Sequence, residues 1–232
     1  TRGPLSQTWL EWQGVRSANP QIYALGVKEL WRVTRPLEGI VHTMAWPLPS
    51  DAFGGSFMYP MADDLVALGL VAGLDYGDAR FDVHEALQRM KLHPLFRERL
   101  EGGELVEWGA KTIPEGGFYS VPERRHGDGL LIVGDAAGYV EVSSLKGIHY
   151  AMLSGIAAAR QIFEALKSGD TSEVGLAGYT AAVDSGPIMR DLSARRNMRL
   201  AFKGGLLLGG AKAGLMTLTK GAFPGGRIAI EE

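Results

Sequence analysis

The chain has 232 residues, of which 46% are hydrophobic, so it can bury a large core as one domain or as two closely packed domains. A formal net charge of −2 gives no general attraction to polyanions, which argues against nucleic acid as a partner. The chain contains no cysteine, and this excludes disulfides, thiol catalysis and cysteine-ligated zinc or iron–sulfur clusters within it. No apolar run approaches the roughly 20 residues that a membrane-spanning helix needs.

The first half of the chain predicts a short helix followed by a sheet. The helix is expected to open near Pro4, because proline is favoured in the first helical turn. The expected strands are residues 20–31, 39–46, 53–60 and 65–73. Their short connections predict a mostly antiparallel arrangement. A helix over residues 81–93, ended by Pro94, and a further strand over residues 104–113 complete this region.

A pair of glycines, Gly54 and Gly55, stands between aromatic residues in the segment FGGSFMYP at 53–60. Two interpretations are open from the residues alone. The glycines can form a tight hairpin turn with the aromatic side chains in the core. Alternatively, they let the backbone approach a flat ring, while Phe53, Phe57, Met58 and Tyr59 supply apolar walls.

The segment GLLIVGDAAG at 129–138 is the stretch around which the second half is organised. The apolar run 129–133 predicts a strand buried on both faces. The small residues after it leave little side-chain bulk, so backbone N–H groups can come close to a ligand above the strand end. In the plainest alternative, Asp135 merely caps a helix.

A long helix is predicted from Gly147, because apolar residues recur three and four apart as far as Leu166. Its N-terminus offers unpaired N–H donors, which favour a group with partial negative charge, such as a phosphate or a flavin ring carbonyl. His149, in the first turn, could favour negative charge on such a ring, or could simply satisfy nearby backbone groups.

This region resembles the second flavin-binding motif of FAD-dependent oxidoreductases built on a dinucleotide-binding fold. It has the same order of a strand, the Gly-Asp-Ala-Ala-Gly turn, a loop and a helix. That resemblance implies that Asp135 accepts a hydrogen bond from the ribityl chain and that the helix N-terminus faces the pyrimidine side of the flavin. The implied cofactor-binding residues are Gly134, Asp135, Ala136, Ala137, Gly138, Lys146, Gly147, Ile148 and His149.

The last part of the chain predicts a helix around residues 176–183 and then changes character. From Arg190 onward, basic residues interleave with apolar ones, and Asp191 is their one acidic neighbour along this stretch up to Lys220. Cationic flanks around an apolar, glycine-rich stretch suit a segment that lies in the interface of an anionic bilayer. The alternative is a pair of core helices covered by a further domain.

A series of motifs, in order, resembles the electron-transfer flavoprotein:ubiquinone oxidoreductase family over residues 1–227. These motifs are PQIYALGVKELW at 20–31, HTMAWPL at 42–48, GGSFMY at 54–59, VAGLDY at 71–76, LEGG at 100–103, WGA at 108–110, PEGG at 114–117 and LKGIHYAM at 145–152. Two departures concern the flavin loop. Ser143-Ser144 stands where relatives often have proline, and Ile148 replaces a common hydroxyl residue.

The resemblance implies electron transfer from reduced electron-transfer flavoprotein to ubiquinone or menaquinone, using FAD and a four-iron four-sulfur cluster. It places the quinone at Phe53, Gly54 and Gly55. It also implies a peripheral, monotopic attachment to the bacterial cytoplasmic membrane or the mitochondrial inner membrane. No catalytic nucleophile, acid–base pair or metal site is expected from the residues.

The expected fold combines α/β and α+β features: part of a glutathione-reductase-like FAD-binding domain with an inserted quinone-binding domain made of a mostly antiparallel sheet. The expected divisions are 1–19 and 125–189 for the FAD-binding domain, 20–124 for the quinone-binding domain, and 190–232 for the membrane-surface segment that leads toward an iron–sulfur domain.

The sequence lacks a Gly-x-Gly-x-x-Gly fingerprint for the ADP half of FAD. We therefore expect the chain to be an interior piece of a longer protein, which alone holds FAD weakly or not at all and lacks the cluster and the activity. The alternatives are a complete small protein with another kind of site, a flavin reductase of the geranylgeranyl-reductase or FixC type, and a non-catalytic membrane-docking module.

Overall fold

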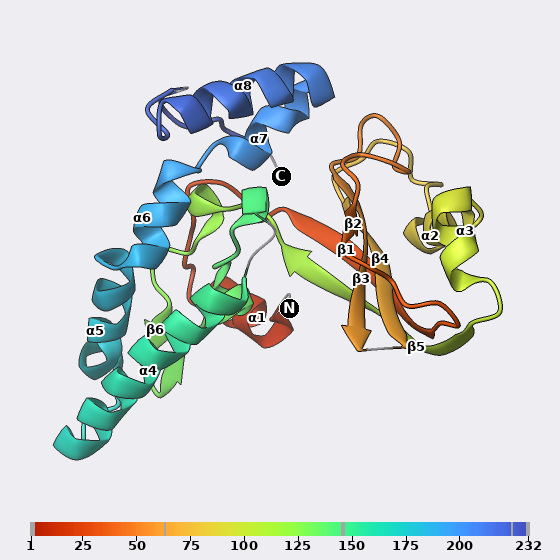
Figure 1. Ribbon diagram of the computed structural model, residues 1–232. Coiled ribbons are helices and arrows are strands. Elements are labelled where there is room, and N and C mark those ends of the chain that lie inside the picture. Colours follow the sequence, from red (N-terminus) through yellow and green to blue (C-terminus); the bar gives the residue numbers. More distant parts are fainter. Residues whose placement is uncertain (1–2, 63, 145–146, 224, 231–232) are drawn as a thin grey trace. The chain divides into compact units, whose positions relative to one another are not determined.

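The computed structural model describes residues 3–62, 64–144, 147–223 and 225–230, and the chain divides into two compact units (Figure 1). Unit 1 comprises residues 1–22 and 114–232, and unit 2 comprises residues 23–113. Unit 2 is therefore inserted into unit 1 along the chain. The finer expected divisions, at residues 19, 124 and 189, stay a prediction.

Unit 2 contains a five-stranded sheet with the strand order β2-β3-β4-β1-β5. The strands are β1 (Tyr23–Arg32), β2 (Val41–His42), β3 (Gly54–Ala62), β4 (Leu65–Gly73) and β5 (Glu104–Pro114). The pairs β1/β4, β3/β4 and β2/β3 are antiparallel, as predicted. β2 is shorter than expected because the chain turns away after Thr43, where the Trp46 N–H donates to Met44 O and the Leu48 N–H to Ala45 O.

The core of unit 2 lies between one face of this sheet and two helices. β4 is the central strand, and alternate residues Val66, Leu68 and Leu70 pack with the helices in one apolar cluster. The helices are α2 (Val83–Lys91) and α3 (Pro94–Leu100). Pro94 ends the predicted helix but also opens α3, which was not predicted, because proline at the first helical position fits a helix start as well as a stop.

A buried ion pair fastens α2 to β1. Glu29 is 3% exposed, and its carboxylate accepts hydrogen bonds from Lys91 Nζ (2.8 and 2.9 Å), Trp31 Nε1 (2.7 Å) and Gln88 Nε2 (3.0 Å). Burial alone would raise the pKa of Glu29, but these hydrogen bonds and the Lys91 charge outweigh burial and lower that pKa. Glu29 and Trp31 of the KELW motif therefore have a structural role on the helix side of the sheet.

Unit 1 is built mainly from helices around a two-stranded ladder. In chain order its elements are α1 (Pro4–Trp12), η1 (Phe118–Ser120), β6 (His126–Gly127), β7 (Leu130–Leu131), η2 (Gly134–Ala137), η3 (Val142–Ser144), α4 (Ile148–Ser168), α5 (Glu173–Asp184), α6 (Pro187–Ala194), α7 (Met198–Ala201), η4 (Phe202–Gly204) and α8 (Leu206–Leu218). The helices predicted near Pro4, from Gly147 and around residues 176–183 are confirmed as α1, α4 and α5.

The predicted strand over residues 129–133, buried on both faces, is wrong in extent and burial. Only Leu130 and Leu131 form a strand, and Val133 is 37% exposed. Among the described residues β7 pairs with β6 alone, so no strand flanks its other edge to extend the ladder. An apolar run predicts a buried strand only where neighbouring strands are present to pair with it.

α4 packs through its small and polar residues. Ser154, Ala158 and Ala165 are buried, whereas the apolar residues that predicted the helix are largely exposed: Ile148 81%, Met152 64%, Ile156 49%, Phe163 65% and Leu166 67%. α4 and α5 run side by side (Figure 1), and the Gln161 amide binds Gly175 O (2.7 Å) between them. The small residues allow this close packing.

Candidate functional site

The predicted quinone segment begins strand β3 in unit 2. Gly54 and Gly55 pair with Ala72 and Val71 of β4, so they lie within the sheet and do not form a hairpin turn. Gly54 has a φ of 145°, and a Cβ added there would lie 2.0 Å from Val71 O. A Cβ on Gly55 would lie 2.0 Å from Thr43 O. Both positions therefore require glycine for close backbone packing.

The aromatic side chains after these glycines do not all line one surface. Phe57 and Tyr59 are two residues apart in β3 and stack with their ring centroids 5.6 Å apart. Gly69 makes room for the Phe57 ring, which would lie 2.5 Å from an added Cβ. Met58, by contrast, is fully buried in the core. The expectation that Met58 supplies an apolar wall beside Phe57 and Tyr59 is therefore wrong, because successive side chains of a strand point to opposite faces.

The predicted flavin segment of unit 1 forms a tight turn in front of α4. Gly134 and Gly138 have φ values of 58° and 81°, and Ala137 is buried. The Gly134 N–H donates to the buried Ser154 Oγ (3.0 Å), and the Gly138 N–H donates to Asp135 O (2.9 Å). These two N–H groups are thus bonded within the protein, contrary to the expectation that the turn's backbone donors meet a ligand.

Asp135 lies beside the start of α4. A Cβ added to Gly147 would be 3.1 Å from Asp135 Oδ1. Among the described residues no side chain caps this helix. Ile148 and His149 in its first turn are exposed, and the centroids of the His149 and Tyr150 rings are 3.8 Å apart. The first N–H groups of a helix have no intrahelical partners. The α4 N-terminus therefore fits an acceptor such as a flavin ring carbonyl. Ala136 is half-buried, and Lys146 lies outside the described residues.

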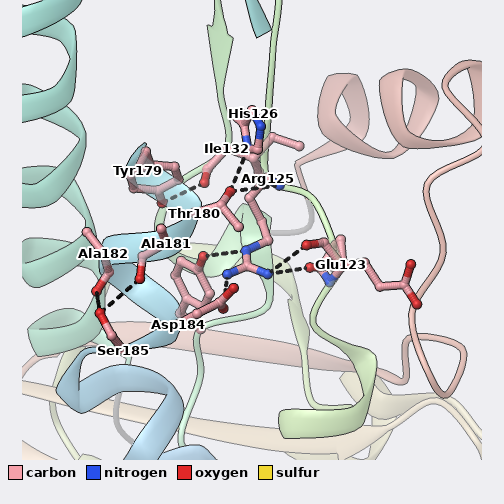
Figure 2. Close-up of polar contacts among 12 residues, drawn as sticks. Glu123, Arg125, His126, Ile132, Tyr179, Thr180, Ala181, Ala182, Asp184 and Ser185 are labelled. Carbon is pink, nitrogen blue, oxygen red and sulfur yellow. Dashed lines mark hydrogen bonds and ion pairs between the residues drawn. The ribbon is translucent and has the colours of Figure 1, made fainter. Parts of the chain in front are cut away.

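A buried arginine holds the residue that follows this turn. Arg125 is 2% exposed, and its guanidinium donates to Tyr139 Oη (3.1 Å), Pro122 O (2.8 Å), Glu123 O (3.2 Å) and the Asp184 carboxylate (Figure 2). Burial opposes its charge, but Tyr139 and Asp184 outweigh burial and raise the pKa of Arg125. Its partner Asp184 is 59 residues away along the chain, so no motif points to this cluster.

The neighbouring His126 and the tyrosines are also polar groups held inside unit 1. His126 Nδ1 lies 2.7 Å from Thr180 Oγ1, and the Tyr179 hydroxyl donates to Ile132 O (2.8 Å) (Figure 2). Burial, together with the charges of Arg124 and Arg125, lowers the pKa of His126. Burial raises the pKa of Tyr139. These groups therefore stay uncharged at neutral pH and act as structural supports.

Replacing Arg125 by methionine should lower the free energy of unfolding of unit 1 by about 2 kcal/mol, because the buried carbonyl of Pro122 and the part-buried carbonyl of Glu123 lose their donor. The loss of stability is limited because the Asp184 side chain is 47% exposed, so water can hydrate its carboxylate when Arg125 is absent. Hydrogen exchange of peptides covering residues 134–144 would measure the effect. The matched control is Arg160→Met on the exposed face of α4, and equal effects of the two substitutions would contradict a role for Arg125.

Two of the basic residues expected at a membrane surface have acidic partners instead. Arg199 is 5% exposed, and its Nε lies 3.1 Å from the carboxylate of the equally buried Glu115. Arg195 lies 3.8 Å from the buried Glu141. The expectation that Asp191 alone balances this stretch is wrong, because both partners come from earlier segments of the chain.

The leucines of α8 are exposed, as an interfacial segment requires, whereas Met216 is buried. Leu207 is 88% exposed, Leu208 63% and Leu218 81%. Over the described residues, no helix combines the length and hydrophobicity needed to cross a bilayer, and no three His, Asp or Glu side chains gather in an arrangement suited to a metal ion.

Comparison with known proteins identifies relatives for both units. Residues 23–113 match the family described as "ETF-QO, ubiquinone-binding". The mitochondrial electron transfer flavoprotein-ubiquinone oxidoreductase of Arabidopsis thaliana is 39% identical over 90% of this chain, and the human protein is 40% identical over 81%. The chain spans about one third of each of these two relatives (33% and 32%).

The fold also resembles that of a solved reductase-like protein. A geranylgeranyl bacteriochlorophyll reductase-like protein from Thermoplasma acidophilum has a TM-score of 0.67 at 19% identity, covering 90% of this chain and 51% of that one. At this identity the likeness shows the fold alone. It confirms the expected fold class, which combines α/β and α+β features and includes a mostly antiparallel sheet.

Proposed function

We propose that this chain, which is related over most of its length to the electron transfer flavoprotein-ubiquinone oxidoreductases, provides the quinone-binding unit and part of the flavin-binding unit of such an enzyme. The resemblance predicted from the sequence motifs is confirmed by the identities of 36–42% to relatives of that name. The enzyme would take electrons from reduced electron-transfer flavoprotein and pass them to a membrane quinone.

One observation carries this proposal: the residues that match the ubiquinone-binding family are the residues that form unit 2. Both run from Tyr23 to Ile113. The matched segment thus has its own sheet, its own helices and its own apolar core. A similarity confined to scattered motifs would not reproduce the limits of a compact unit.

In this proposal the two units have separate tasks. Unit 2 would present Phe53 and the backbone of Gly54 and Gly55 to the quinone ring, and the two glycines allow the close backbone packing that fixes this segment in the sheet. Unit 1 presents Asp135 and the N-terminus of α4 to the isoalloxazine of FAD. FAD, when bound, supplies the redox chemistry, since it can accept electrons from a protein donor and pass them to a quinone. The chain's own residues bind and orient the two rings.

The four-iron four-sulfur cluster expected for the family does not fit this chain's residues. Such clusters are held by thiolates, and the 232 residues contain no cysteine. Any cluster ligands must therefore come from residues outside this sequence, and we assign no step of the reaction to a cluster here.

We further propose a peripheral, monotopic attachment to the membrane through α8. Its exposed leucines would enter the bilayer interface, and Lys212 and Lys220 would meet anionic headgroups. This attachment would bring the protein to the lipid phase in which quinones dissolve. The membrane would be the bacterial cytoplasmic or the mitochondrial inner membrane.

The decisive assay follows oxidation of reduced electron-transfer flavoprotein by the protein expressed at its natural length. The acceptors are a short-chain ubiquinone and a short-chain menaquinone, tested separately to identify the preferred quinone. Quinone-dependent oxidation supports the proposal. Flavin retention without oxidation of electron-transfer flavoprotein would favour a reductase of the geranylgeranyl-reductase or FixC type. Binding to anionic vesicles without flavin or turnover would indicate a membrane-docking module.

A further inference from the structure

A hydroxyl pair lies next to the glycines of the quinone segment. Thr43 Oγ1 and Ser56 Oγ are 2.7 Å apart, and Ser56 is fully buried. Thr43 follows the end of β2, whereas Ser56 follows Gly55 in β3. The pair therefore joins the 43–48 turn to the strand that carries Gly54 and Gly55.

The Thr43 hydroxyl makes more contacts than a simple surface hydroxyl. It donates to Trp46 O (2.6 Å), which closes the 43–48 turn, and it accepts the Ser56 N–H (3.0 Å). Because its single proton is used on Trp46 O, the 2.7 Å contact with Ser56 is donated by the Ser56 hydroxyl. One oxygen atom thus fixes the shape of the turn and its attachment to β3.

Backbone hydrogen bonds join the same two segments on either side of this hydroxyl pair. The Thr43 N–H donates to Ser56 O (2.9 Å) and the Ala45 N–H donates to Gly54 O (2.9 Å). Thr43 O also occupies the space where a Cβ of Gly55 would lie. The backbone of Gly54 and Gly55 is consequently held between β4 on one side and the 43–48 turn on the other.

We infer that Thr43 and Ser56 are positioning residues for quinone binding, which rests on the function proposed above. They do not meet the quinone themselves. They hold the Gly54–Gly55 backbone at a fixed distance from the quinone ring. A displacement of this backbone by about 1 Å can slow a reaction roughly 10²-fold. Without the Thr43 hydroxyl, the Trp46 carbonyl and the Ser56 N–H and hydroxyl would lose their shared partner. Backbone hydrogen bonds would still join the turn to β3, but they would hold the glycines less firmly.

The test compares Thr43→Val, which keeps the side-chain shape but removes the hydroxyl, with Thr43→Ser, which keeps the hydroxyl. Both are made in the protein at its natural length. We expect Thr43→Val to raise the KM for a one-isoprenoid ubiquinone roughly tenfold, because three hydrogen bonds that share the Thr43 oxygen are lost and the Gly54–Gly55 backbone is held less firmly. Reduction of the enzyme flavin by electron-transfer flavoprotein, measured without quinone, should not change. Thr43→Ser should restore most of the quinone affinity.

Thr34→Val is the matched control, because the Thr34 hydroxyl makes one exposed 3.4 Å hydrogen bond to Glu101 O in the same unit. An unchanged quinone KM in Thr43→Val would overturn the inference, as would an equal loss in flavin reduction. If Thr43→Val does not fold, Ser56→Ala decides by the same KM criterion. A wild-type enzyme that oxidises no electron-transfer flavoprotein with quinone would instead contradict the proposed function itself.

Discussion

Replacing Lys91 by methionine is expected to lower the free energy of unfolding of unit 2 by about 3–5 kcal/mol, because the change leaves a buried carboxylate without its cation. Lys91 is the one cation that contacts Glu29 among the described residues, and the two side chains are 15% and 4% exposed. Trp31 and Gln88 would still donate to the carboxylate, but neither carries charge. Hydrogen exchange of peptides from β1 and β4 would measure the loss.

Arg89→Met is the matched control for this prediction. Arg89 lies on the same helix and pairs with Glu85 one turn away, but both side chains are mostly exposed, at 74% and 59%. Exposed pairs of this spacing contribute about 0.3–0.5 kcal/mol. The double variant Glu29→Gln, Lys91→Met should recover part of the stability, since it removes the uncompensated charge. A Lys91→Met effect no larger than that of Arg89→Met would refute the role of the buried pair.

The pH dependence of the same pair gives an independent check. In the wild type the pKa of Glu29 is lowered, so the pair contributes its full stability above the ordinary pKa of 4.5 and loses it as the pH falls through the lowered value. In Lys91→Met, burial without a cation should raise the pKa of Glu29, so the folded state of the variant is most stable when this carboxyl is protonated. The stability difference between the two proteins should therefore begin to shrink above pH 4.5, as the pH falls through the raised pKa of the variant, and should continue to shrink as it falls through the lowered wild-type pKa.

The sheet of unit 2 could be predicted from the sequence because its strands have local signatures. β1, β3, β4 and β5 lie within three residues of the expected segments, and short connections indicated the antiparallel pairing of β3 with β2 and with β4. Two features were harder. β2 is cut short by a turn whose hydrogen bonds involve Ser56, 13 residues away, and α3 begins at the same Pro94 that ends the preceding helix.

The supports of the candidate sites could not be predicted, because their partners are far apart in the chain. Arg125 meets Asp184, Glu115 meets Arg199 and Glu29 meets Lys91, at separations of 59, 84 and 62 residues. A single sequence shows that each residue is charged but not which charges are buried together. By contrast, Gly54 and Gly55 could be singled out from the sequence, because adjacent glycines indicate close packing. The backbone atoms that crowd them, Val71 O and Thr43 O, come from other segments and could not be named.

Replacing Gly55 by alanine should reduce quinone turnover by roughly 10²-fold, the largest functional effect that we expect. The added Cβ would lie 2.0 Å from Thr43 O and 3.0 Å from Thr43 C. These are backbone atoms, so β3 or the 43–48 turn must move. Gly55 has no positive φ, and backbone strain therefore does not add to this collision. Quinone-dependent oxidation of electron-transfer flavoprotein, measured beside flavin reduction without quinone, would separate the two half-reactions.

Two glycines of the same unit serve as controls for Gly55→Ala. At Gly109 an added Cβ meets nothing within 4 Å, so Gly109→Ala should leave both half-reactions unchanged. At Gly103 an added Cβ would lie 2.7 Å from Arg32 O, which also forces the backbone to move, but far along β1 from the quinone segment. If Gly103→Ala lowers quinone turnover as much as Gly55→Ala, the loss reflects general damage to the sheet. A loss confined to Gly55→Ala, with flavin reduction intact, would locate the quinone at the start of β3.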